Sequence, residues 1–173
     1  MYRQYQNSGV LTELGEGIRA LSNAIRYLPQ NHPMQAPCLD GLGTLFQRRF
    51  DRLADLADIN EAITVQQRAV RLTSDAHPQK PVYLNNLGVS LRNRFEHQDD
   101  VADIDKAITL QQQAVDLTPD GDSYKPARLN NLGSSFLRRF ERLNAPADID
   151  EAIKAQKHAL RLTPRTSGQS CRC

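Results

Sequence analysis

The chain has 173 residues, of which 39% are hydrophobic and 24% are charged, and its formal net charge is +2. These proportions are ordinary for a soluble protein, and so small a net charge does not by itself indicate nucleic acid or a membrane surface as the partner. No apolar run approaches the roughly 20 residues needed to span a bilayer, and the N-terminal stretch lacks the apolar segment of a secretory signal.

The cysteine content indicates a reducing compartment. Cys38, Cys171 and Cys173 form an odd and sparse set that gives no disulfide framework, so we expect the cytoplasm rather than a secreted location. The Cys-Arg-Cys ending offers two thiols, whereas structural zinc is held by four ligands. We therefore expect no metal and no cofactor.

The sequence repeats with a fixed period. Gly43, Gly88 and Gly133 lie 45 residues apart, and other residues keep the same spacing, namely Phe50, Phe95 and Phe140, and Asp58, Asp103 and Asp148. Self-similarity at a period of this size is typical of a solenoid. Each unit buries its apolar face only against its neighbours, so the array keeps a long exposed surface that is suited to recognition.

In chain order, residues 1–10 are predicted to be an N-terminal tail. Residues 11–28 form an orphan second helix of a repeat, because their apolar residues lie one period before apolar residues of the next copy. These matches are Ile18 with Ile63, Ala24 with Ala69, and Ile25 with Val70.

Three repeats follow, at about 36–80, 81–125 and 126–164, and residues 165–173 are predicted to be a C-terminal tail. Each repeat contains a helix A and a helix B, and in the second copy these cover about 81–97 and 101–118. Apolar residues at spacings of three and four define helix A, as in Leu84, Leu87, Leu91 and Phe95. The sequence thus predicts an all-α solenoid of about seven antiparallel helices with a right-handed superhelical curve.

Two repeated residue types interrupt the apolar faces. The glycines lie in the middle of helix A, where each costs roughly 1 kcal/mol relative to alanine, so we expect them to allow close approach of helix B. Glutamines lie within the apolar arc of helix B, at Gln66, Gln111 and Gln156. We expect these to tie helix B to a neighbouring helix; contact with a ligand is the alternative.

The chain resembles the tetratricopeptide repeat family. The residues that carry the resemblance are Leu84, Leu87, Gly88, Ala107, Ala114 and Pro119, with equivalents one period later. The repeated phrases Leu-Asn-Asn-Leu-Gly and Ala-Asp-Ile-Asp are similar to the long arrays of fungi, some of which precede a caspase-like CHAT protease domain. The resemblance implies that the A helices line a concave, peptide-binding groove. The glutamines depart from the family pattern, which has a large apolar residue there.

Candidate peptide-binding residues lie at the outward positions of helix A. They are Asp40, Asn85, Asn86, Arg92, Asn130, Asn131, Ser134 and Arg138. An asparagine amide offers donors and an acceptor, so a row of them can hold an extended peptide backbone. The alternative is that these side chains bond to adjacent helices, and the sequence leaves both interpretations open.

Arginines gather at the ends of the A helices, interleaved with acidic residues. Local ion pairs and helix-end charges explain them best, and an electropositive strip for an acidic peptide is the alternative. The four histidines occupy unrelated positions without a paired nucleophile, so we expect no enzyme activity.

Two functions remain open. The first is a scaffold that binds peptide or protein segments in the concave groove, with neither nucleic acid nor membrane as partner. The second is a structural or self-association segment of a larger protein, such as the repeat part of a CHAT-type protease. The second draws support from the last helix, where Ile153, Leu160 and Leu162 are expected to lack a covering helix.

Overall fold

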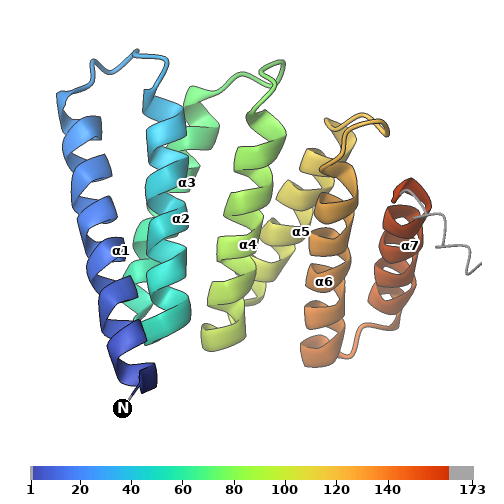
Figure 1. The fold of residues 1–173 in the computed structure, drawn as a ribbon. Helices are drawn as coiled ribbons and strands as arrows, with labels where there is room; N and C mark the ends of the chain where they lie inside the picture. Colours follow the sequence, from blue (N-terminus) through green and yellow to red (C-terminus); the bar gives the residue numbers. More distant parts are fainter. Residues whose placement is uncertain (1, 164–173) are drawn as a thin grey trace, which may run out of the picture.

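The computed structural model describes residues 2–163, and within that range it contains seven α-helices and no strand. The helices, shown in Figure 1, are α1 (Tyr2–Tyr27), α2 (Gln35–Leu53), α3 (Leu56–Leu72), α4 (Lys80–Gln98), α5 (Val101–Asp116), α6 (Lys125–Leu143) and α7 (Pro146–Leu162). The prediction of an all-α helical-repeat solenoid is confirmed. The right-handed sense of its curve stays a prediction.

The first helix is longer than expected. It begins at Tyr2, so the prediction of a tail over residues 1–10 is wrong. No proline precedes Pro29, and Gly9, the one glycine among residues 1–10, weakens a helix by only about 1 kcal/mol. The predicted C-terminal tail, with Cys171 and Cys173, lies outside the described residues. None of the described helices combines the length and the apolar character needed to cross a membrane.

The helices pack as a line of pairs. Each A helix packs on the B helix that follows it, as α2 on α3, α4 on α5 and α6 on α7, and α1 packs on α2. Successive A helices also contact each other, whereas no such contact joins α3 to α5 or α5 to α7 within the described range. Figure 1 shows α2, α4 and α6 in one row, with α3 and α5 behind them. Elements on the inner side of a curved stack lie closest together, so the contacts between successive A helices place α2, α4 and α6 on the concave side.

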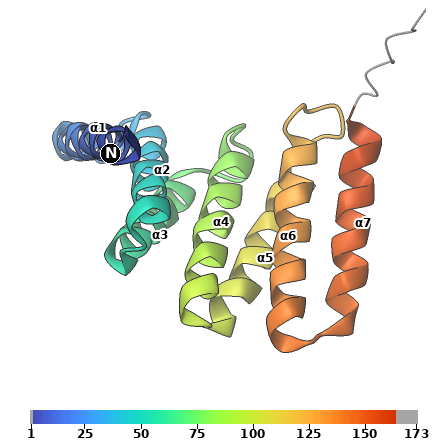
Figure 2. The ribbon, with the colours of Figure 1, turned by 60° about the horizontal axis from the view of Figure 1, so that its bottom comes forward.

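The array also twists along its length. In the turned view of Figure 2, α1 is seen almost along its axis, while α6 and α7 are seen lengthwise. A segment that followed the concave side would therefore change direction from one repeat to the next.

The repeated glycines permit the close approach that their spacing predicts. A Cβ atom added to Gly88 would lie 2.6 Å from Cγ of Gln111 and 3.1 Å from the carbonyl oxygen of Ala107. At Gly43 the nearest atom would be Cγ of Gln66, at 2.5 Å. Side-chain carbons do not approach this closely, so only glycine allows helix A to lie against helix B here.

The glutamines lie at the same contact. Gln66 is fully buried, and its Oε1 accepts a hydrogen bond of 2.6 Å from Oγ of Ser90, which ties α3 to α4. This confirms the structural interpretation for Gln66. Gln111 is equally buried, but neither end of its amide has a partner among the described residues, and Gln156 is exposed.

The first residues of α2 and α4 close the junctions with the preceding helices. Lys80 is buried, and its Nζ donates to the carbonyl oxygens of Val70, at 2.9 Å, and Thr73, at 2.7 Å. Gln35 caps α1 in the same way, donating to Leu28 O at 3.0 Å. A donor at these unpaired carbonyls satisfies the C-terminus of helix B and fixes the start of the next A helix.

Candidate functional site

Four of the predicted site residues form one hydrogen-bonded chain across three A helices, which we call the amide ladder. Nδ2 of Asn131 on α6 donates to Oδ1 of Asn85 on α4, at 3.0 Å. Asn85 in turn donates to Asn86 at 3.5 Å, and Asn86 donates to both carboxylate oxygens of Asp40 on α2, at 3.1 and 3.0 Å. The ladder therefore links successive repeats on their concave side.

The ladder explains why these residues occur as neighbouring pairs. The second residue of one pair donates to the first residue of the preceding pair, a separation of 46 residues, or one period plus one. Asn86 reaches Asp40 and Asn131 reaches Asn85 in this way. Asn130 begins the last pair; no further A helix follows α6 within residues 2–163, and its side chain is exposed.

Asp40 determines how the asparagine amides of the ladder are oriented. Its side chain is buried, and burial raises the pKa of its carboxyl, an effect that the hydrogen bond from Asn86 partly offsets. An ionised carboxylate only accepts hydrogen bonds, so Asn86 must turn its NH2 toward Asp40 and its oxygen toward Asn85. Asn85 then turns its own oxygen toward Asn131.

The ladder bears on both interpretations of the asparagines. Asn85, Asn86 and Asn131 are half-buried and bond to neighbouring helices, which is what the structural alternative requires. Each amide nevertheless has hydrogen-bonding capacity beyond the ladder.

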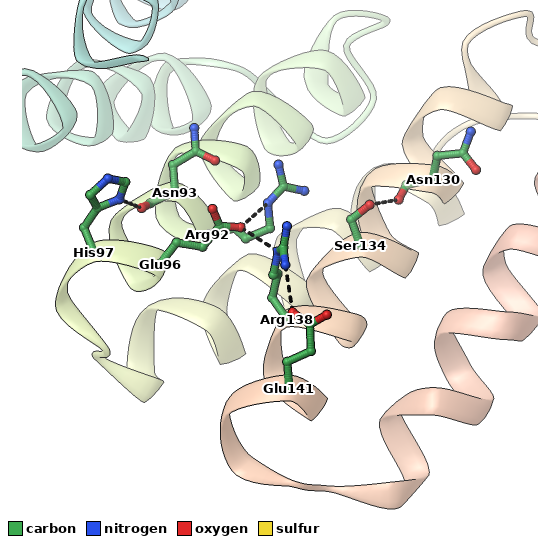
Figure 3. A network of polar contacts seen from close by, with 8 residues as sticks. All are labelled: Arg92, Asn93, Glu96, His97, Asn130, Ser134, Arg138 and Glu141. Carbon is green, nitrogen blue, oxygen red and sulfur yellow. Dashed lines mark hydrogen bonds and ion pairs between the residues drawn. The ribbon is translucent and has the colours of Figure 1, made fainter. Parts of the chain in front are cut away.

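A second group of site residues lies nearer the C-terminal ends of α4 and α6, and we call it the charge cluster (Figure 3). Nε of Arg138 lies 3.0 Å from Oε1 of Glu96, and Nε of Arg92 lies 3.8 Å from the same oxygen. Nη1 of Arg138 also donates to Glu141, at 2.7 Å. Two positive and two negative groups balance here, so this part of the arginine-rich strip is not electropositive.

The two arginines of the cluster differ in their surroundings. Burial lowers the pKa of Arg92, and the charge of Arg138 adds to this effect while Glu96 opposes it. Arg138 is exposed, and its hydrogen bond to Glu141 and the charge of Glu96 raise its pKa. Arg92 is thus held in place, whereas the Arg138 side chain is open to solvent.

Ser134 and Asn130 lie on α6, one above the other, in Figure 3. Oγ of Ser134 donates to the backbone carbonyl of Asn130 at 2.8 Å, so its proton is engaged within its own helix. The structure therefore distributes the eight predicted residues among the ladder, the charge cluster and this pair, of which Asn130 is exposed and Ser134 is half-buried.

The remaining arginines make local ion pairs, as sequence analysis favoured, but with partners that it did not identify. Arg49, Arg94 and Arg139 each make two hydrogen bonds to the aspartate nine residues later. The aspartates are Asp58, Asp103 and Asp148, and the N–O distances run from 2.5 to 2.8 Å. These clamps fasten each A helix to its own B helix. The signal was present as an arginine and an aspartate that recur together at the 45-residue period.

A cleft of about 510 Å³ opens between the N-terminal halves of α4 and α6. Asn85, Asn86 and Asn131 of the ladder line it, together with Tyr124 and Arg128. Arg128 is buried and was not predicted as a site residue. It gives no repeat signal, because the same position holds Tyr83 in the preceding repeat.

The comparisons with known proteins agree with the helical-repeat fold. The tetratricopeptide repeat family model matches residues 82–120. A crystal structure of a Podosopora anserina protein with nearly identical TPR-like repeats, provisionally named a kinesin light chain, is 15% identical, with a TM-score of 0.67 over 95% of this chain and 74% of that one.

A crystal structure of a point variant of the same Podosopora anserina protein is 14% identical, with a TM-score of 0.68 over 96% of this chain and 73% of that one. At such identities the likeness shows the fold. A search of the curated proteins found no match.

Proposed function

We propose that this chain, built of tetratricopeptide repeats, is a protein-interaction scaffold. Its concave side, formed by α2, α4 and α6, holds an extended segment of a partner. The amide ladder carries this proposal. An asparagine amide can donate two hydrogen bonds and accept two. Asn131 uses one donor in the ladder, and Asn130 makes no side-chain hydrogen bond among the described residues. These groups are available to the backbone of a bound segment.

The charge cluster would flank such a segment. The hydroxyl oxygen of Ser134 lies on α6 about one turn from Asn130, and the exposed guanidinium of Arg138 belongs to the following turn of the same helix (Figure 3). Arg92 lies on α4 and is paired with Glu96, one turn later on the same helix. The proposed path thus runs from the ladder to the charge cluster and leaves the packed faces undisturbed.

A peptide array probed with the intact chain tests this function. We expect binding of extended peptides, and Asn131→Ala should weaken a selected peptide about five- to tenfold, the equivalent of one lost hydrogen bond. Fluorescence anisotropy measures the affinity. Gln113→Ala on the opposite side, at α5, is the matched control and should leave the affinity unchanged, because Gln113 is exposed. Equal affinities for the parent and Asn131→Ala would remove the ladder from the binding site.

Three further points belong to the same proposal. The repeats extend over about 36–80, 81–125 and 126–164, the partner is a protein or peptide, and the compartment is the cytoplasm. The sparse cysteines support that compartment, because secreted domains of this size commonly use disulfides. The pairing of α2 with α3, α4 with α5 and α6 with α7 supports the repeat boundaries.

Self-association is a second candidate function, and the outer face of α7 favours it. Ile63 and Ile108 are 3% and 8% exposed, whereas Ile153 in the same position is 42% exposed. Leu160 is 75% exposed, whereas Val115, one period earlier, is 6% exposed. Within residues 2–163, an apolar face that the following A helix covers in the preceding repeats is thus exposed on α7.

Sedimentation over a wide concentration range tests the second function. We expect the average mass of the parent chain to rise with concentration, and Ile153→Lys with Leu160→Gln to abolish the rise. Leu137→Gln is the control, because Leu137 is similarly exposed but lies on the A helix α6. A parent chain that stays monomeric throughout would contradict self-association.

A further inference from the structure

Two equivalent junctions of the array differ in one buried contact. Between α3 and α4, Oε1 of Gln66 accepts a hydrogen bond of 2.6 Å from Oγ of Ser90. One period later, Gln111 on α5 and Ser135 on α6 are as deeply buried, at 0% exposed. Among residues 2–163, however, neither end of the Gln111 amide nor Oγ of Ser135 has a partner. An unbonded polar group in the interior is costly, so these two side chains would gain from a bond to each other.

The position of α6, rather than that of Gln111, accounts for the difference. A Cβ added to Gly43 would lie 2.5 Å from Cγ of Gln66, and a Cβ added to Gly88 would lie 2.6 Å from Cγ of Gln111. Both glutamines therefore pack in the same way on the A helix of their own repeat. Because Ser135 belongs to the next A helix, α6 must lie on α5 at a different offset from that of α4 on α3.

A second contact shows the same difference. Nζ of Lys80, at the start of α4, donates to two carbonyl oxygens at the end of α3 and also lies 3.1 Å from Oδ1 of Asp75. The equivalent Lys125 keeps the pairing with the loop, at 2.7 Å from Oδ1 of Asp120. In the described part of the chain it makes no hydrogen bond to α5. The start of α6 is therefore not tied to the end of α5 in this way.

Ion pairs hold α6 at its present offset. They join Arg139 to Asp105 on α5, Arg138 to Glu96 on α4, and Arg142 to Asp99 at the end of α4. The three carboxylate side chains are 35% to 54% exposed, so water and salt weaken these pairs. At the preceding junction a neutral residue, Asn60, occupies the position of Asp105 and accepts from Arg94. The second junction thus depends more on exposed charges than the first.

We propose that the α5–α6 junction is a two-state hinge, on which the α6–α7 pair moves relative to the rest of the array. In the first state, seen here, the ion pairs hold α6 and the Gln111 amide is unbonded. In the second state α6 lies on α5 as α4 lies on α3, and Gln111 accepts a hydrogen bond from Ser135. Because the exposed ion pairs favour only the first state, a rise in ionic strength favours the second. The hinge changes the shape of the concave side between α4 and α6, and it does not depend on the scaffold function.

Pulsed electron–electron double resonance on paired spin labels tests the hinge. Ala57, Ala102 and Ala147 are exposed, lie one period apart, and occupy the same position in the first turns of α3, α5 and α7. Labelled cysteines replace two of them at a time in the full chain, whose native cysteines are changed to alanine. The 57/102 pair reports the first junction and the 102/147 pair the second. At about 1 M NaCl the Debye length falls to about 3 Å, and we expect a second population of distances for 102/147 while 57/102 keeps one population.

Ser135→Ala is the decisive variant, because it removes the donor of the second state and leaves the ion pairs in place. Its 102/147 distances should stay in the first population at high salt. Asp105→Asn, which copies Asn60 of the preceding repeat, should give the second population already at low salt. Circular dichroism establishes that each variant is folded.

Three results would overturn the hinge. The first is a 102/147 distance that salt leaves unchanged in the parent, and the second is an equal change in the 57/102 pair. The third is a second population that persists undiminished in Ser135→Ala. An Asp105→Asn chain with the low-salt distances of the parent would also count against it. None of these results bears on peptide binding, so the hinge and the scaffold function can fail separately.

Discussion

The two faces of the A helices hold the array together by different chemistry. The face toward the B helices is apolar and closely packed, with Gly88 against Gln111 and with Leu84 and Leu91 at most 2% exposed. The concave face is joined by side-chain hydrogen bonds and ion pairs, such as Asn131 to Asn85 and Arg138 to Glu96. Packing tolerates little change in volume, whereas an amide or a surface ion pair can be replaced at small cost. The concave face can therefore differ between arrays that share one fold.

Substitution at the packed face should produce the largest loss of stability. Gly88→Val adds a branched side chain where even a Cβ would lie 2.6 Å from Gln111. We expect a loss of about 3 kcal/mol in the free energy of unfolding, at the upper end of overpacking costs. Urea denaturation measures it. Gly121→Val is the control, because nothing lies within 4 Å of a Cβ at that position; equal losses in both variants would contradict the close contact.

Loss of the clamp between helices A and B should produce the second largest loss of stability. Asp103→Ala removes two of the three hydrogen bonds of the Arg94 guanidinium, those of 2.6 and 2.7 Å, at a position where Asp103 is only 5% exposed. Because Arg94 keeps some contact with water, we expect a loss of about 2 kcal/mol, less than for a fully buried pair. Thermal unfolding of Asp103→Ala beside that of Asp150→Ala, an exposed residue on α7, would show it. Similar midpoints for the two variants would mean that the clamp contributes little.

On the concave face, Asn85→Ala should cost about 1 kcal/mol, because it removes the acceptor of Asn131 and the donor to Asn86. The repeat pattern predicts an outward-facing side chain, for which a change within about 0.5 kcal/mol would be typical. Because Asn85 is half-buried, we expect a larger loss of stability than is typical of an outward-facing residue. Asn130→Ala, at the matched but exposed position, serves as the reference in the same denaturation series. A loss for Asn85→Ala no greater than for Asn130→Ala would show that the ladder does not stabilise the array.

The packed face was the more predictable of the two, for a physical reason. Contacts that recur in every unit leave a periodic signal, and Gly43, Gly88 and Gly133 therefore pointed to a close helix contact. The ladder depends on how far one A helix is displaced from the next, which the sequence of one repeat does not specify. Arg128 is a single departure from the repeat, so periodicity could not draw attention to it. The early start of α1 depends on local helix propensity, where no repeat guides the interpretation.

Acidity should affect the ladder through Asp40. Burial raises the pKa of its carboxyl above the ordinary value of 3.8. The folded state therefore favours the protonated form, so this contribution to stability is fully present below the ordinary pKa and is lost as the pH rises through the raised pKa. Asp40→Asn removes the titration, and its stability relative to the parent should increase between pH 3 and pH 7. Denaturant titrations at several pH values, with the exposed Asp51→Asn as reference, measure the difference. A relative stability that falls with rising pH would contradict the burial of this charge.

The smallest effect on stability should come from the charge cluster, at Arg138. Its side chain is 49% exposed, and its partners Glu96 and Glu141 are 35% and 47% exposed. Water and salt screen such pairs, so Arg138→Ala should change the free energy of unfolding by no more than about 0.5 kcal/mol, and less in high salt. Denaturation in low and high salt measures this change. The same substitution should nevertheless weaken a peptide bound along the concave side, because the exposed guanidinium lies on the proposed path, about two helical turns beyond Asn130 on α6. If Arg138→Ala lowered the free energy of unfolding by more than about 1 kcal/mol and left the peptide affinity unchanged, Arg138 would have a structural role. The peptide would then not bind at the charge cluster.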